Sequence, residues 1–300
     1  MKFKIIDVEE IYNNDNNLKK ENVNMLMEWA EKQPHLPKVS ELIMACFLHS
    51  CFYKIEAAKS AIDVYFTGST VNPDMFQFKN VLQDPMVKRT IDNNLVVILP
   101  KKAPNGDSAF LLVPSVSPEN YHYPSQCRVL DAQRMIHLHE KGPFTGIHII
   151  IDLKNVVFGH FIKLSTTAMA VKNYLYILQE GLPVRLKHIH FINIVSFMDK
   201  ILALIKPFMK KELQEKLRVH TDINSLYTYI PQDLLPVEYG GSCESSDVLK
   251  ENVKKLLVDN EDFLIAQDAL VVDESKRTER NEKLNDVFGI AGSFKKLEVD

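Results

Sequence analysis

Cysteine is scarce in this 300-residue chain, which contains only four, and no two of them form a CxxC pair or a repeated spacing. Cysteines scattered in this way indicate free thiols in a reducing compartment and not a disulfide framework. Long apolar runs are also missing, because no stretch reaches the eighteen apolar residues that predict a membrane-spanning helix. The first ten residues, MKFKIIDVEE, lack the apolar core of a signal peptide. Together these absences predict a cytosolic protein.

Motifs of common α/β enzymes are absent too. The chain has no GxSxG elbow, no GxxxxGKS/T phosphate loop, no GxGxxG loop and no HExxH zinc motif. Each of these motifs places a nucleophile, a phosphate or a metal ion, so their absence favours a binding protein over an enzyme. We therefore predict no catalytic residue, no cofactor and no resident metal.

Neither sign of charge dominates, since 36 Lys and Arg face 39 Asp and Glu for a formal net charge of −3. The stretch 183–218 is locally basic, with eight basic and three acidic side chains. The residues from Glu244 onward are acidic instead, with nine basic and fourteen acidic side chains. A basic surface of this size is too small to predict nucleic-acid binding.

Two apolar runs, at 146–152 and 187–193, are rich in isoleucine and bounded by Gly, Pro and Asp, which is typical of strands buried on both faces. The segment 165–180 between them has apolar residues at spacings of three and four, which predicts a helix. A strand, a helix and a strand in this order form a right-handed crossover that joins parallel neighbours. A second crossover leads to a short strand near 217–220. The sequence therefore predicts an α/β fold with a mostly parallel sheet.

Helices are predicted on both sides of this sheet. The first hundred residues show helical periodicity, including one face around Trp29, the only tryptophan. The tail begins with a predicted helix at 248–257, continues through a polar segment at 273–281 that reads as an exposed linker, and ends in apolar residues that are expected to pack back on the body. We therefore expect a helical module at 1–75, an α/β domain at 76–242 and a tail at 243–300.

Histidines occur in pairs two residues apart. His137 and His139 form one pair, His188 and His190 form another on a predicted strand, and His148 lies on the strand before it. Two histidines at this spacing share one face of a strand, where they are able to hold a metal ion. No carboxylate or thiol falls at a matching spacing nearby, so the pattern favours separate buried polar residues over a metal site.

The stretch 197–217 is amphipathic and basic. One face is apolar, lysines occupy the rest, and Pro207 interrupts the stretch. A basic amphipathic helix with an internal break fits a lid that touches a membrane. An ordinary surface helix has the same composition, and spacing alone does not separate the two.

An ordered series of motifs spans much of the chain. It consists of IIID at 149–152, LPVRLK at 182–187, IHFIN at 189–193, IKPF at 205–208 and LPVEYGG at 235–241. This series resembles the CRAL-TRIO lipid-transfer family and, within it, the branch of the alpha-tocopherol transfer protein and the retinaldehyde-binding protein. The stretch 29–66 resembles the N-terminal helical module of that family, and the ending 292–300 resembles its arthropod members.

The resemblance implies a cytosolic carrier that holds one lipophilic molecule between the sheet and a mobile helical gate. A tocopherol, a retinoid, a carotenoid or a terpenoid is the kind of ligand implied, and we expect the carrier to be a monomer. The gate corresponds to 197–217. The ligand-binding positions implied by the family are Val129, Gln133, Ile136, Ile149, Ile151, Phe158, Ile192, Ile194, Phe197, Ile201, Leu204 and Phe208.

The resemblance also implies a basic patch that binds phosphoinositide headgroups at a membrane surface. The patch positions correspond to Lys59, Arg185, Lys187 and Lys216, but at a further one the chain carries Glu212, an acid where the family has a base. Three alternatives stay open at this point. They are a phospholipid or phosphoinositide exchange protein, a non-catalytic adaptor and an α/β-hydrolase-like enzyme.

Overall fold

The computed structural model describes residues 2–79, 81–279 and 281–289, and within them it shows a five-stranded sheet. The strands lie side by side in chain order: β1 (Leu95–Ile98), β2 (Ser108–Val113), β3 (Ile147–Asp152), β4 (Leu186–Ile192) and β5 (Leu217–Val219). β1 is antiparallel to β2, and the other three pairs are parallel. The predicted α/β fold class is therefore confirmed. The ending 292–300 lies outside the described residues.

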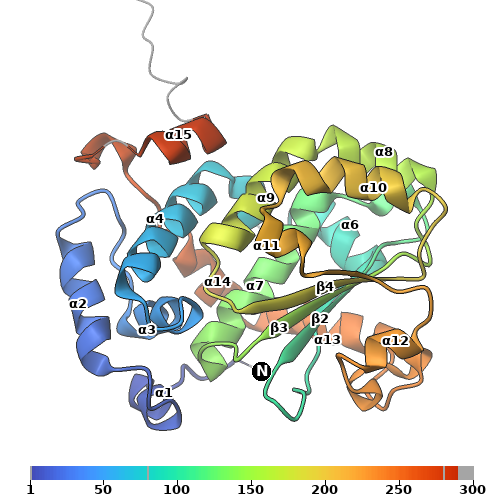
Figure 1. Cartoon of the computed structure of the whole chain (residues 1–300), viewed down its shortest axis with the longest axis horizontal. Helices are drawn as coiled ribbons and strands as arrows, with labels where there is room; N and C mark the ends of the chain where they lie inside the picture. The colour runs from blue at the N-terminus through green and yellow to red at the C-terminus, as the bar shows by residue number, and fades with distance from the viewer. Residues whose placement is uncertain (1, 80, 280, 290–300) are drawn as a thin grey trace, which may run out of the picture.

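Helices surround this sheet (Figure 1). The helices before β1 are α1 (Val8–Asn14), α2 (Lys20–Glu31), α3 (Glu41–Ser50), α4 (Ile55–Val71), α5 (Pro73–Phe76) and α6 (Pro85–Asn93). The helices between strands are α7 (Tyr123–Lys141), α8 (Phe158–Thr166), α9 (Ala168–Glu180), α10 (Met198–Ile205) and α11 (Lys211–Gln214). The helices after β5 are α12 (Asn224–Tyr227), α13 (Ser246–Asp259), α14 (Glu261–Gln267) and α15 (Glu282–Phe288).

The amphipathic stretch 197–217 is three short elements and not one helix. α10 ends at Ile205, a 3-10 turn covers Lys206–Phe208, and α11 follows. Pro207 explains the break, because proline has no backbone N–H and its ring clashes with the preceding turn of an α-helix.

Alternation along the strands gives the sheet two unlike faces. Leu112, Ile151 and Phe191 are register partners, so they share one face, which we call the cavity face. Figure 1 shows α8, α9 and α10 on one side of the sheet and α12 on the other. His148 lies three residues before Ile151, and His190 lies one residue before Phe191, so both lie on the opposite face, which we call the histidine face.

β1 is an edge strand, and one side chain of α7 closes its free edge. The Gln133 amide Nε2 donates to the Val96 carbonyl at 2.9 Å, and Gln133 Oε1 accepts from the Ile98 N–H at 3.1 Å. An uncovered edge strand presents a row of unpaired backbone groups. Gln133, which is buried, satisfies two of them and ties α7 to the sheet.

The C-terminal segment is anchored to the N-terminal helices by charge. The Arg277 guanidinium donates to both carboxylate oxygens of Asp63 on α4, at 2.8 and 3.0 Å, and Asn281 Nδ2 donates to the same carboxylate at 3.1 Å. The Arg277 side chain is only 9% exposed. The prediction that 273–281 is an exposed linker is therefore wrong at Arg277. The domain boundaries predicted from the sequence stay predictions, because the hydrophobic core runs continuously from the N-terminal helices through the sheet to α14.

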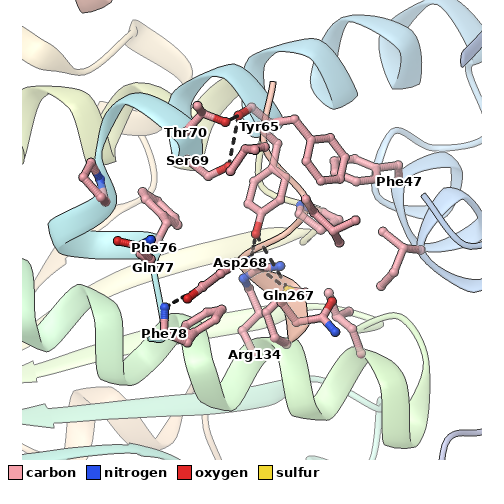
Figure 2. A pocket seen from close by; sticks show the side chains of 18 residues that line it. Phe47, Tyr65, Ser69, Thr70, Phe76, Gln77, Phe78, Arg134, Gln267 and Asp268 are labelled. Carbon is pink, nitrogen blue, oxygen red and sulfur yellow. Dashed lines mark hydrogen bonds between the residues drawn. The ribbon is translucent and has the colours of Figure 1, made fainter. Parts of the chain in front are cut away.

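A second charged pair lies deeper, on α7. Arg134 Nε donates to Asp131 Oδ1 at 2.7 Å, and Arg134 Nη2 donates to the Tyr65 hydroxyl at 2.7 Å. Asp131 and Arg134 are 2% and 3% exposed. Figure 2 shows Arg134 and Tyr65 facing each other in a small cavity of about 80 Å³, where α4 and α7 meet the segment around Asp268. The pair therefore holds the N-terminal helices against α7.

Candidate functional site

A second cavity, of about 140 Å³, lies on the cavity face of the sheet beneath α8, α9 and α10. Its floor is made by side chains of β2, β3 and β4, and its walls by the four helices α7 to α10. The lining residues are Leu112, Pro114, Tyr121, Tyr123, Gln126, Ile151, Leu153, Val156, His160, Phe161, Leu164, Val171, Leu175, Ile189, Phe191, Ile201, Ile205 and Met209. No Asp, Glu, Lys or Arg is among them, so the cavity suits an apolar ligand.

Two polar side chains in the wall, His160 and Gln126, form hydrogen bonds with the protein itself. His160 Nδ1 accepts from the Val157 N–H at 3.1 Å, and His160 Nε2 donates to the Ser115 carbonyl at 2.9 Å. Burial lowers the pKa of His160, which keeps the ring neutral. Gln126 Nε2 donates to Asn94 Oδ1 at 3.2 Å. These groups fix the start of α8 and of α7, and neither forms a nucleophile and base pair with a neighbour.

α10 and the segment after it cover the cavity. Ile201 and Ile205 on α10 are buried and line the cavity, as does Met209 just after the 3-10 turn. The spacing of four places Ile201 and Ile205 on one face of the helix. Ala203, on the same helix, is exposed. α10 therefore presents its apolar face to the cavity and its other face to solvent.

Exposed apolar side chains stand on the helices that cover the cavity. Phe158 and Ile162 on α8 are 45% and 51% exposed, and Met169 on α9 is 64% exposed. Val157, just before α8, is also exposed. We call these four residues the apolar rim. Single exposed apolar residues are ordinary, but several gathered beside one cavity indicate an interaction surface. Within the described residues, no helix has both the length and the apolar character needed to cross a bilayer.

A basic groove opens on the surface between the N-terminal helices and the segment after α10. It is lined by Arg185, Lys210 and Lys216, together with the acids Glu180 and Glu212. Lys210 forms an ion pair with Glu180, and Lys216 Nζ donates to the Leu186 carbonyl at 2.7 Å. The groove therefore has a modest excess of basic side chains for an anionic headgroup.

The sequence pattern favoured separate histidines on β3 and β4. In the structure, however, the rings of these histidines lie together. His148 Nδ1 and His190 Nε2 are 3.0 Å apart on the histidine face, and the His188 ring lies beside both. Asp107, which precedes β2, places a carboxylate oxygen 3.6 Å from His148 Nε2. The sequence argument missed this carboxylate because it reaches β3 from a neighbouring strand.

Comparison with known proteins identifies the family. The family model described as the CRAL/TRIO domain matches residues 93–241, and the Pinta-like UBA domain matches residues 15–86. The alpha-tocopherol transfer protein-like protein of Mus musculus is 32% identical to this chain over 254 residues, which cover 81% of the chain and 70% of that protein. The chain belongs to the CRAL/TRIO family.

A second relative and one solved structure are also similar to this chain. Clavesin-1 of Xenopus laevis is 29% identical over 195 residues, which cover 61% of the chain and 55% of that protein. Among solved structures, the crystal structure of Sfh5 covers 80% of this chain and 89% of its own, with a TM-score of 0.45 and 14% identity. CRAL/TRIO proteins bind and transfer lipids, generally without catalysis. The family resemblance inferred from the motif series is thus confirmed.

The CRAL/TRIO positions predicted to bind ligand are spread over more than the cavity. Ile151 and Ile201 line it. Ile149 shares their face of the sheet, whereas Ile192 lies on the histidine face. Three predicted positions, Val129, Gln133 and Ile136, are buried on α7 without lining the cavity, and four others stand at its edge or outside it: Phe158, Ile194, Phe197 and Phe208. Leu204 is half-buried on α10.

Several lining residues were not among the predicted ones, although their spacing held a signal. Val171 and Leu175 stand four apart on α9, and Ile205 stands four residues after the predicted Ile201 on α10. Ile189 and Phe191 alternate on β4. A spacing of four on a helix, or of two on a strand, identifies the buried face of that element. It does not show where two buried faces leave a cavity between them.

The four predicted phosphoinositide positions separate in the structure. Arg185 and Lys216 line the basic groove, whereas Lys59 and Lys187 do not. Lys59 pairs with Glu56 at 2.7 Å on α4. Arg185 Nε donates to the His49 carbonyl at 2.9 Å, and its guanidinium lies over the rings of Phe52 and Tyr53. Arg185 therefore also docks the α3–α4 turn onto the sheet.

Proposed function

We propose that this CRAL/TRIO protein carries one small lipophilic molecule in the cavity and exchanges it at cytoplasmic membrane surfaces when α10 moves. The observation that carries the proposal is the cavity, which has no charged lining residue and is covered by α10. A molecule that hides on the order of 400 Å² of apolar surface gains about 10 kcal/mol at about 25 cal/mol/Å². Such a ligand leaves into water slowly, so delivery requires opening at a bilayer. A tocopherol-, retinoid-, carotenoid- or terpenoid-like compound fits this chemistry.

The small size of the cavity supports a movement of α10 when the ligand binds. The cavity measures about 140 Å³, whereas pockets for drug-sized ligands measure about 300–1,000 Å³. The segment that carries α10 has a special backbone site at each end. Asn193 has a φ of 50°, which non-glycine residues seldom adopt, and Pro207 ends α10. Such sites are suited to act as hinges, because they absorb backbone rotation at the ends of a moving element.

The ligand itself provides the direct test. The purified protein is extracted with organic solvent, before and after incubation with a mixed lipid extract, and the contents are identified by mass spectrometry. One apolar compound per chain of the tocopherol, retinoid, carotenoid or terpenoid type supports the proposal. A two-chain phospholipid supports the exchange protein instead. A protein that stays empty in both samples contradicts the proposal and favours an adaptor.

The apolar rim is expected to contact the membrane during exchange. Ile162→Asp with Met169→Asp should reduce binding to neutral vesicles by 10- to 100-fold. Fully burying one such side chain contributes about 1.5–3 kcal/mol, and partial insertion contributes less. Ligand affinity in solution should stay the same, because neither residue lines the cavity. Vesicle co-sedimentation and ligand titration measure the two effects.

A matched pair on the far side serves as the control for this prediction. Val248→Asp with Val258→Asp changes two exposed valines of α13, which packs against β1 and lies away from α8 and α9. This variant should bind vesicles like the wild type. Equal binding by the rim variant and the control variant would remove the apolar rim from the mechanism.

The basic groove is expected to strengthen docking on anionic membranes. Lys210→Glu with Lys216→Glu should slow ligand transfer to phosphoinositide vesicles by about tenfold or more, since each basic residue near such a surface contributes about 1 kcal/mol. Transfer to neutral vesicles should change little. Exposed charges are screened over about 8 Å at physiological salt, so added salt should shrink the difference. Fluorescent-ligand transfer to both vesicle types measures this.

The control here must change the net charge by the same amount. Lys4→Glu with Lys88→Glu alters two exposed lysines outside the groove. Arg185 is left intact, because its contacts with the α3–α4 turn would confuse docking with folding. If the groove and control variants slow transfer equally, net charge and not the groove attracts the membrane.

A further inference from the structure

A row of three histidines crosses the histidine face of the sheet, on the side opposite the lipid cavity. His148 Nδ1 lies 3.0 Å from His190 Nε2, and His190 Nδ1 lies 2.9 Å from His220 Nε2. The three side chains stand on β3, on β4 and just after β5. His190 is wholly buried, and the other two are about 5% exposed. Each neutral ring in the row has one nitrogen that donates and one that accepts, so the position of one hydrogen restricts the positions of the others.

One end of the row fixes the protons of its members. The Ser225 hydroxyl donates to the Asp222 carbonyl at 2.6 Å, so its oxygen accepts from His220 Nδ1, also at 2.6 Å. His220 Nε2 then has no hydrogen and accepts from His190 Nδ1. A neutral imidazole has a hydrogen on only one nitrogen. His190 Nε2 is therefore left as a bare lone pair that faces His148.

The other end of the row lies beside a carboxylate. Asp107 Oδ2 accepts from Asn105 Nδ2 at 2.9 Å and lies 3.6 Å from His148 Nε2, which is too long for a hydrogen bond. In the absence of a metal ion, a hydrogen on His148 Nδ1 therefore donates to His190 Nε2 at 3.0 Å. If this hydrogen moves to His148 Nε2, beside Asp107, the lone pairs of both nitrogens become free to bind a metal ion.

A third nitrogen converges on this point. His188 is the register partner of His148, and among the described residues its buried Nδ1 has no hydrogen-bond partner. One ring nitrogen from each of His148, His188 and His190 lies within 4.8 Å of the others. Zinc–nitrogen bonds of about 2.0–2.1 Å place tetrahedral ligands about 3.4 Å apart. To reach that spacing, the half-buried His188 ring would have to move toward the other two rings.

We propose that His148, His188 and His190 bind one divalent transition-metal ion of the zinc type, with Asp107 and His220 orienting two of the ligands. Three imidazoles with one open position are a common donor set for Zn²⁺. A carboxylate behind a ligating histidine is the usual support in such sites. Burial lowers the pKa of His188 to about 4 and that of His190 to about 3, so both rings are neutral, as metal ligands must be.

The surroundings of this site are mixed in charge and partly closed. The Tyr229 ring covers His188 and His190, with centroid distances of 4.8 and 5.1 Å. Arg218 and Lys187 add positive charge nearby, which disfavours protonation of the row. The Asp107 carboxylate offsets this charge at the metal. Metal binding at this site does not require a lipid, so the metal-site proposal and the carrier proposal are tested separately.

Metal titration of the full chain tests the proposal. Protein made without a histidine tag is stripped with a chelator and titrated with Co²⁺, whose visible absorption reports tetrahedral nitrogen coordination. We expect one equivalent to bind, Zn²⁺ to displace it, and Zn²⁺ to raise the melting temperature. No uptake at micromolar free metal would overturn the proposal. So would a row that only takes up a proton, seen as histidine NMR shifts that change with pH and not with Zn²⁺.

Variants locate the site. His188→Gln should fold like the wild type, because His188 is only half-buried, and should lose at least 100-fold in Co²⁺ affinity. Asp107→Asn should lose about 10- to 100-fold, as expected for a residue that orients a ligand. His122→Gln, which removes an imidazole at the start of α7, is the control and should bind normally. Wild-type affinity in His188→Gln would show that the metal binds elsewhere and overturn the assignment.

Discussion

Replacing Ile201 with aspartate is expected to reduce lipid affinity by at least 100-fold while the fold persists. Ile201 is 6% exposed and lines the cavity from α10. A carboxylate there either stays charged in an apolar space, at several kcal/mol, or takes up a proton and still presents two polar oxygens to the ligand. Each 1.4 kcal/mol lost is a factor of ten in affinity. Titration with a fluorescent lipid, combined with circular dichroism of the empty protein, measures both quantities.

Two further variants separate loss of the ligand from loss of the fold. Ala203→Asp introduces the same charge on the exposed side of the same helix and should bind lipid normally. Ile201→Trp fills the cavity with an apolar group and should also exclude the ligand, without a buried charge. If Ile201→Asp and Ile201→Trp both keep wild-type affinity in folded protein, the ligand does not bind beneath α10.

Replacing Arg134 with leucine is expected to lower the free energy of unfolding by about 3–5 kcal/mol, because it leaves a buried charge without its partner. Asp131 is 2% exposed, and Arg134 is the only cation that it contacts among the described residues. Arg134 also holds the hydroxyl of Tyr65 on α4. Urea unfolding followed by circular dichroism measures the change, with the exposed Arg89→Leu as the control.

The double variant and the pH dependence identify the cause. Asp131→Leu with Arg134→Leu removes both charges and should recover much of the lost stability. Burial already raises the pKa of Asp131 in the wild type, and loss of Arg134 raises it further. The folded variant then holds a proton that the unfolded chain releases above its pKa of about 3.9, so its deficit should shrink as pH falls. A deficit independent of pH and retained in the double variant would indicate lost packing instead.

The architecture of the sheet followed from local pattern. The runs at 146–152 and 187–193 became β3 and β4, and the helix between them made these strands parallel neighbours, as the crossover rule requires. One exception is the segment 165–180, which holds two helices because α8 ends at Thr166 and α9 starts at Ala168. Local apolar periodicity does not show where one helix stops and another begins on the same buried face.

The sites were harder to predict, because each depends on residues far apart in the chain. Asp107 and His220 reach His148 and His190 only through the pairing of strands, so spacing along the chain concealed the row. From the sequence, Arg185 was expected to be a surface charge that contacts a membrane. In the structure its guanidinium donates to the His49 carbonyl on the N-terminal module. The family positions on α7 failed to line the cavity for a similar reason, since helix rotation is fixed by tertiary contacts.

Gln133 on α7 shows what such a contact achieves for the whole molecule. Its amide occupies both the backbone carbonyl and the backbone N–H that β1 would otherwise offer to a strand from another chain. A protein that exposes apolar side chains on α8 and α9 is at risk of self-association, and an open strand edge would add a second route to it. With these two groups bonded internally, the β1 edge offers fewer backbone partners to a second copy. Under the proposed function, copies that meet on one bilayer are therefore less prone to lasting association through this edge.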